Sequence, residues 1–334
     1  MARGSSGRGS AADPAAAEGL RRAVEAWREI GAADHPIDAE LLTGGRHATT
    51  VHLRPSGGSG ASVVAKVRPP GGLDLERLIH EVILPDLGVE TPEFLGFASG
   101  SAGESDVLFL EYVGSAEFQS SDPAHQEAAG RWLGRFHAAS ARASMPALIP
   151  RRDLEEDRVE VSSARMQLAS ILDNPALGDE GGLLVSRVLE LLDTATGRWS
   201  EWAERTAWVP RVLTHGAFIS RNVRMRGAGS TLTTLPFDWD HVAIRSPAID
   251  LARTSGPSHG FGACASLGRY RTTLAAHGLP LDRSVVAAVA AMGTVIRAAA
   301  CIGWLIGSLE SEYANRRLGD VEIYRQALEG ALSE

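Results

Sequence analysis

The sequence is poor in cysteine. Its 334 residues include two, Cys264 and Cys301, and they lie far apart along the chain. This separation does not match the close spacing of metal-binding cysteine motifs. We therefore favour two buried free thiols in a reducing cytoplasm over a disulfide.

The chain also lacks an excess of positive charge. Lys and Arg number 33 against 41 Asp and Glu, which gives a formal net charge of −8. Because binding to a phosphate backbone relies on clustered Lys and Arg, this balance argues against a nucleic-acid partner. A cationic substrate would suit such a surface, although the charge alone does not establish one.

A secretory signal and a clear membrane span are missing as well. Residues 1–12 are rich in Gly, Ser, Ala and Arg and have no apolar core, so we expect a disordered tail. Residues 284–309 form the most apolar run, which is long enough to span a membrane. However, Arg297 interrupts this run and small residues dominate it. We therefore predict a buried helix and no membrane partner.

What is present favours two lobes or two small domains, since 44% of the residues are apolar and the chain is long. Segments 37–42, 49–54 and 62–68 have the composition of strands. Gly44 and Gly45 lie between the first two. A glycine pair there lets backbone N–H groups approach phosphates, and an ordinary tight turn is the alternative.

A single lysine interrupts the apolar strand at residues 63–67. Burying Lys66 is costly unless an anionic group lies beside it. A phosphate or a carboxylate would serve, and kinases place a strand lysine against nucleotide phosphates. The alternative is a lysine whose stem is buried at a sheet edge while its ammonium stays in water.

Two polar clusters stand within residues 212–252. The first contains His215 and Asn222, and the second contains Asp238 and Asp240. The apolar segment 232–237 predicts a strand, which places Asp238 at its end. If the strand continues, both carboxylates point to one face. Carboxylate and amide oxygens together suit a hard cation such as Mg²⁺.

This stretch resembles the catalytic core of the aminoglycoside phosphotransferase family, whose pattern is roughly H-G-D-x-x-x-x-N, then I-D-W-[DE], then G-D-P-x-x-D-L-A. The matching residues are His215, Gly216, Asn222, Asp238, Trp239, Asp240, Pro247, Asp250, Leu251 and Ala252. Ala217 stands where the family carries its catalytic Asp. The resemblance therefore implies that the metal ligands are kept while the general base is missing.

The resemblance implies an α+β, two-lobed protein-kinase-like fold. A small sheet-containing lobe with its hinge would cover residues 13–113, and a larger helical lobe would cover residues 114–334. It also implies a nucleotide site in the first lobe. Lys66 would pair with Glu81 on a helix at residues 75–84, and Glu76 is the competing partner on that helix. Glu111 and Val113 would contact adenine through their main chains.

In the second lobe the resemblance makes His215 and Asn222 catalytic-loop residues, with Asn222, Asp238 and Asp240 as metal ligands. Asp250 would accept hydrogen bonds from the loop backbone, with a helix N-cap as its alternative role. We expect His137 to be a packed core histidine.

The implied activity is ATP- and Mg²⁺-dependent phosphorylation of a hydroxyl on a small molecule or on a peptide Ser or Thr. Ala217 leaves alternatives open, because a missing base typically costs about 10²–10⁴ in rate. The chain could be a pseudokinase that binds nucleotide or a partner protein as a scaffold. It could also be an enzyme whose base comes from elsewhere, or one in which the Asp was replaced.

Overall fold

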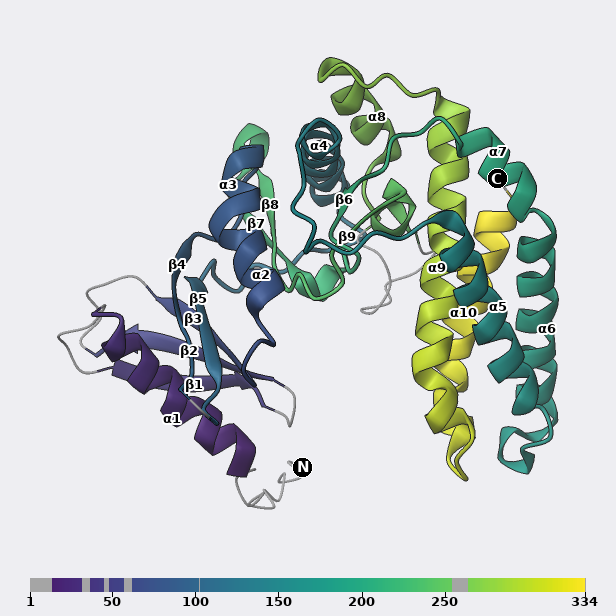
Figure 1. Cartoon of the computed structure of the whole chain (residues 1–334). Coiled ribbons are helices and arrows are strands. Elements are labelled where there is room, and N and C mark those ends of the chain that lie inside the picture. Colours follow the sequence, from purple (N-terminus) through teal and green to yellow (C-terminus); the bar gives the residue numbers. More distant parts are fainter. Residues whose placement is uncertain are drawn as a thin grey trace, which may run out of the picture. The chain divides into compact units, whose positions relative to one another are not determined.

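The computed structural model describes residues 14–31, 37–44, 48–56, 62–101, 103–253 and 264–333. The chain divides into two compact units, residues 1–85 with 92–114 and residues 86–91 with 115–334 (Figure 1). The predicted tail at residues 1–12 lies outside the described residues, and so does Gly45.

The first unit is built on a five-stranded antiparallel sheet with the order β1-β2-β3-β5-β4. Its strands are β1 (Ile37–Thr43), β2 (Thr49–Pro55), β3 (Val63–Arg68), β4 (Phe94–Ala98) and β5 (Asp106–Glu111). The strands expected from the sequence are therefore present, with ends that shift by a residue or so.

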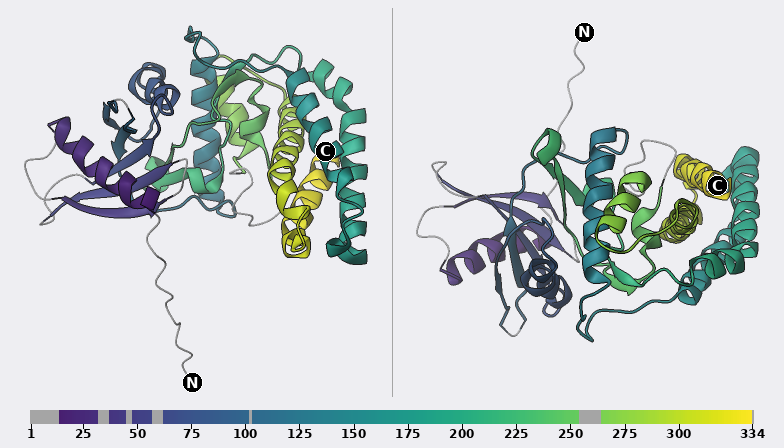
Figure 2. Two further views of the ribbon diagram at one scale, coloured as in Figure 1. Left: turned by 60° about the horizontal axis from the view of Figure 1, so that its bottom comes forward. Right: turned by 90° about the horizontal axis from the view of Figure 1, so that it is seen from above.

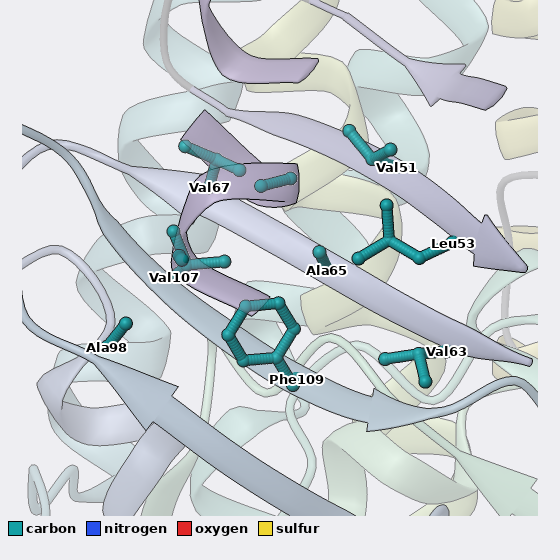
Figure 3. Packing of buried hydrophobic residues seen from close by; sticks show 10 residues of the cluster. Val51, Leu53, Val63, Ala65, Val67, Ala98, Val107 and Phe109 are labelled. Atoms are coloured by element: carbon teal, nitrogen blue, oxygen red, sulfur yellow. The ribbon is translucent and has the colours of Figure 1, made fainter. Parts of the chain in front are cut away.

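Helix α1 (Pro14–Glu29) covers one face of this sheet. Buried apolar side chains of β2, β3 and β5, among them Leu53, Ala65 and Phe109, point toward it and form the core shown in Figure 3. Successive side chains in a strand point to opposite faces. Lys66 therefore points to the other face, on which Leu73, Leu108 and Leu110 form a second apolar cluster.

The helical segment after β3 is continuous but changes its winding. It runs through α2 (Asp74–Leu78), a π-helical turn (Ile79–Ile83) and α3 (Leu84–Leu87). The helix expected at residues 75–84 is therefore present. The π turn alters which side chains share a face along it.

The second unit is mainly helical, with two small antiparallel sheets that pair β6 with β9 and β7 with β8. Its strands are β6 (Val212–Thr214), β7 (Val223–Arg226), β8 (Thr233–Pro236) and β9 (Ala243–Arg245). Its helices are α4 (Pro123–Ser140), α5 (Leu154–Ser170), α6 (Gly178–Gly197), α7 (Trp199–Thr206), α8 (Leu267–Ala276), α9 (Arg283–Leu309) and α10 (Leu318–Leu332).

Helix α9 is the central helix of this unit. It packs against α5 and α10, and α6 packs on both of those helices (Figure 2). In the described part of the chain it is the one helix long and apolar enough to cross a membrane, and 89% of its most apolar window is buried inside the protein. The prediction of a buried helix is confirmed. Cys264 and Cys301 are both buried and neither forms a disulfide, as expected.

Candidate functional site

Lys66 is the only lysine in the sequence, and it is buried on β3. Its Nζ lies 2.6 Å from Oε2 of Glu76, which is 3% exposed on α2. A buried ammonium needs such a partner, because removing an unpaired charge from water costs on the order of several kcal/mol. The pair therefore holds the lysine head on the sheet face opposite α1.

The pairing of Lys66 with Glu81 was wrong, and the competing choice, Glu76, is the partner. Glu81 instead accepts a 2.7 Å hydrogen bond from Arg77 on the exposed side of the helix. The contacts of the two glutamates therefore place them on different faces of this helical segment. Glu81 also lies inside the π-helical turn, where sequence spacing predicts facing poorly.

Gly44 lies close to α1. A Cβ added to it would sit 2.8 Å from Cβ of Ala16, so the close approach of the helix requires glycine there. This packing role is a sufficient reason for Gly44, and its contact with a phosphate stays a prediction. Gly45, the second member of the pair, lies outside the described residues.

The segment at the end of β5 has its main chain partly engaged. The N–H of Glu111 donates to the Glu93 carbonyl at 2.9 Å, and the N–H of Tyr112 donates to the Ser62 carbonyl at 3.0 Å. Of its main-chain groups, Glu111 could therefore offer only its carbonyl to an adenine ring. Val113 lies two residues after the end of β5. Tyr112 stacks on His52 of β2 with 3.9 Å between ring centroids. Burial lowers the pKa of His52, and Arg54 adds to the effect.

In the second unit, the loop after β6 is held by a buried carboxylate. Asp250 accepts hydrogen bonds from the backbone N–H of His215 at 2.8 Å and of Gly216 at 2.9 Å. It also contacts Nε2 of His137 at 3.2 Å, and the Nδ1 of that ring lies 3.0 Å from the Tyr270 hydroxyl. Burial alone would raise the pKa of Asp250, but the contacts with His137 and His215 lower it below its ordinary value.

Gly216 has a left-handed backbone, with φ at +74°. A Cβ on it would lie 2.0 Å from the His241 carbonyl oxygen, so no other residue fits. Its carbonyl accepts a 2.6 Å hydrogen bond from Nη2 of Arg297 on α9. Burial lowers the pKa of this arginine. The Arg297 guanidinium, on an otherwise apolar helix, thus holds the loop through the Gly216 carbonyl.

His215, which we expected among the catalytic-loop residues, lies inside this loop. It is fully buried, its Nε2 lies 3.0 Å from the Phe237 carbonyl, and its Nδ1 accepts the Ala217 N–H at 3.3 Å. Burial lowers the pKa of His215 and outweighs the opposing effect of Asp250. With both ring nitrogens used by backbone groups, His215 positions the loop and is not placed to touch a substrate.

A hairpin brings the two polar clusters together. Asn222 immediately precedes β7 and Asp238 follows β8, and these strands pair with Val223 opposite Pro236. The Phe237 N–H also donates to the Asn222 carbonyl at 3.0 Å. The Asn222 side chain uses Nδ2 to donate to the Ala217 carbonyl at 3.2 Å, so its amide oxygen is the atom it could present to a cation.

The two aspartates converge by a turn and not by the extended strand that we expected. β8 ends at Pro236, and Asp238 has φ at +68°. Trp239 between them is fully buried, with its ring 4.4 Å from the His215 ring. A carboxylate oxygen of Asp238 and one of Asp240 nevertheless lie within 4.8 Å of each other. Two oxygens at this separation fit a hard divalent cation bound between them.

Three positioning residues were not assigned such a role from the sequence. Arg297 is a charge within an apolar run, and this unusual position was the sequence signal for a buried contact. His137 was expected to be a core residue, and nothing in its sequence surroundings pointed to Asp250. Tyr270, which lies against His137, carried no signal.

The sequence matches the phosphotransferase enzyme family over residues 38–286. No curated protein matches it. Among solved structures, the fold is similar to a choline kinase from Cryptosporidium parvum, with a TM-score of 0.56, 14% identity, and 94% and 96% of the two chains covered. A macrolide 2'-phosphotransferase from Brachybacterium faecium gives a TM-score of 0.56, 17% identity, and coverage of 92% and 97%. A spectinomycin phosphotransferase solved with ADP and spectinomycin gives a TM-score of 0.56, 14% identity, and coverage of 90% and 94%.

These likenesses confirm the predicted α+β kinase-like fold, with a small antiparallel sheet followed by a mainly helical remainder. The family match extends over more than half of the sequence and includes the loop with Asn222 and the turn with Asp238. The chain therefore belongs to the phosphotransferase enzyme family.

Proposed function

We propose that this protein is an ATP- and Mg²⁺-dependent phosphotransferase that phosphorylates a hydroxyl of a small molecule, at a rate reduced by Ala217. The observation that carries the proposal is the loop of the second unit. There, Asp250 and Arg297 fix the backbone of Gly216 while a hairpin brings Asn222 toward Asp238. Phosphoryl transfer depends mainly on positioning and electrostatics, and this loop is rigidly positioned.

The donor atoms suit a hard cation. Asp238 and Asp240 offer carboxylate oxygens within 4.8 Å of each other, and Asn222 has an amide oxygen to add. When bound, Mg²⁺ would neutralise charge on the transferred phosphoryl group. The chain's own contribution is to hold these oxygens just beyond the end of a short hairpin, on either side of the buried Trp239.

In the first unit, Lys66 would hold the phosphates of the nucleotide. Its ammonium is oriented by Glu76 on the sheet face opposite α1. The adenine would lie near the end of β5, where the Glu111 carbonyl and the Val113 N–H are the main-chain groups we assign to it. We propose that the two units correspond to the nucleotide lobe and the acceptor lobe of the fold.

The acceptor class is supported by the similar structures. Those named above are described as kinases or phosphotransferases of choline, spectinomycin and macrolides, which are small molecules with hydroxyl groups. A cationic group on the acceptor would match the net charge of −8. A small-molecule alcohol is therefore a better substrate class for this chain than a peptide.

Ala217 gives a second candidate function. It is buried and has no group that can accept the proton of an attacking hydroxyl. General-base catalysis typically contributes about 10²–10⁴ in rate, so its loss slows transfer without affecting the nucleotide site. A chain that binds nucleotide without useful turnover would then act as a pseudokinase.

The test compares ADP formation by the natural chain, Ala217→Asp and Ala217→Asn across a panel of amino alcohols and sugars. The Asn variant is matched in size but cannot act as a base. If the proposal holds, Asp raises acceptor-dependent turnover by about 10² or more, and Asn leaves it near the natural rate. If Asp and Asn behave alike while nucleotide binding persists, the pseudokinase candidate replaces the enzyme.

A further inference from the structure

A cavity of about 310 Å³ lies beside α7 and the first turns of α9, within the second unit. It is separate from the loop described above. Ser284, on its wall, precedes Arg297 by thirteen residues on the same helix, which is about 20 Å at the rise of an α-helix. The volume falls at the lower end of the range typical for small-molecule sites.

The cavity has an arginine-rich wall. Its lining includes Arg198, Arg205 and Arg283, and none of its described lining residues is acidic. Arg198 has partners already, because it donates to the Leu332 carbonyl at 2.7 Å and its guanidinium lies 5.2 Å from the Trp202 ring centroid. Glu201 approaches Arg198 at 3.9 Å but does not line the cavity.

Arg205 and Arg283 are two arginines of this acidic chain that line one cavity without a carboxylate partner among the described residues. Within the described residues neither forms an ion pair, whereas Arg21, Arg165 and Arg325 do. Two unneutralised guanidinium groups at one cavity attract an anion, and their planar donors match the oxygens of a phosphate group.

The remaining wall is apolar. Trp202 and the alanines at positions 287, 288 and 291 provide it, and Ser284 adds a hydroxyl near the arginines. Small side chains on one helix face leave a smooth surface against which a flat or compact group can lie. The cavity thus offers a charged part and an apolar part side by side.

We propose that this cavity binds a phosphate monoester with a compact apolar body, at a second site distinct from the catalytic loop. The phosphate lies between Arg205 and Arg283, and the apolar body lies against Trp202 and the alanines of α9. This site goes beyond the proposed phosphotransferase activity and does not depend on it.

The experiment is a calorimetric titration of the full chain with phenyl phosphate. The test variant is Arg205→Gln/Arg283→Gln, and the control is Arg158→Gln/Arg165→Gln, which removes the same charge from exposed positions of α5. Because the test variant loses charge-assisted hydrogen bonds to the phosphate, we expect it to weaken binding about tenfold or more. The control should stay within about twofold.

The catalytic site would also accept phosphate groups, so the same titration is run on Lys66→Met. Binding that survives this change supports the second site, and binding that disappears with it overturns the proposal. The proposal is also overturned if the natural chain binds phenyl phosphate more weakly than about 1 mM, or if test and control variants weaken it equally.

Discussion

At the scale of single residues, the proposed nucleotide contact in the first unit depends on which glutamate Lys66 contacts. Glu76 is buried and 2.6 Å from the ammonium, whereas Glu81 is bound to Arg77 at the surface. Their identical chemistry and their positions on one helix make them a matched pair. Comparing variants of the two therefore separates the effect of burial and contact with Lys66 from the effect of losing a negative charge.

We expect Glu76→Gln to weaken ATP binding about tenfold or more, because removing one partner of a buried charge pair typically costs about 2–5 kcal/mol. Glu81→Gln should change it less than about twofold, as for exposed pairs. Amine-directed labelling with and without ATP reports the site directly, since the chain has no other lysine side chain. Equal effects of the two substitutions would refute the assignment of Glu76.

Asp250 ties the loop to the core and makes stability depend on pH. Its pKa is lowered in the folded protein, so it stabilises the fold above its ordinary pKa, and this contribution is lost as the pH falls through the lowered value. Asp250→Asn should cost about 3–5 kcal/mol near neutral pH. The difference in free energy of unfolding between this variant and the unsubstituted chain should disappear in acid.

Urea denaturation at several pH values measures this gap. Asp193→Asn is the control, because Asp193 also has a lowered pKa, caused first by its hydrogen bond from Arg165, but lies at the surface. Exposed pairs contribute at most about 1 kcal/mol. A gap for Asp250→Asn that stays constant into acid would contradict a buried, ionised carboxylate.

At the scale of elements, α9 supports the loop by close packing as well as by Arg297. A Cβ on Gly293 would lie 1.8 Å from the Ala248 carbonyl oxygen, in the short 3₁₀ segment (Pro247–Leu251) that carries Asp250. The helix and this segment therefore touch backbone to backbone. Thr294, the next residue, accepts a 2.9 Å hydrogen bond from the Arg253 N–H.

Gly293→Ala should destabilise the protein by more than about 2 kcal/mol, since backbone must move to admit the methyl group. Gly303→Ala is the control on the same helix, because a Cβ there meets nothing within 4 Å. It should stabilise by about 0.5–1 kcal/mol through helix propensity. Chemical denaturation of both variants decides the matter, and a neutral Gly293→Ala would contradict the close contact.

At the scale of the whole molecule, local composition predicted the first strands and the buried helix, and the family resemblance implied a sheet-containing lobe followed by a helical one. The resemblance also implied that Asp250 accepts hydrogen bonds from the loop backbone, as it does, while the metal-ligand role of Asn222 and Asp238 stays a prediction. The sequence did not predict the partner of Lys66, because a π turn changes the phase of the helix after Glu76. It also missed how Arg297 and His215 hold the loop, since these contacts join segments distant in sequence.

The turn at Asp238 shows the same limit. The composition of residues 232–237 is that of a strand, and we expected an extended chain to carry both Asp238 and Asp240. Burial of Trp239 against the His215 ring instead bends the chain after Pro236. Tertiary packing outweighed local preference at a position where two carboxylates converge.

The most direct test of the proposed function is calorimetric titration of ATP into the natural chain and into Asp238→Ala, each with and without Mg²⁺. Oxygen ligands that share Mg²⁺ with nucleotide phosphates make the two bind together. We predict that Mg²⁺ tightens ATP binding about tenfold or more in the natural chain and has little effect in the variant. ATP binding that is the same with and without Mg²⁺, and unchanged by Asp238→Ala, would contradict a magnesium-dependent phosphotransferase.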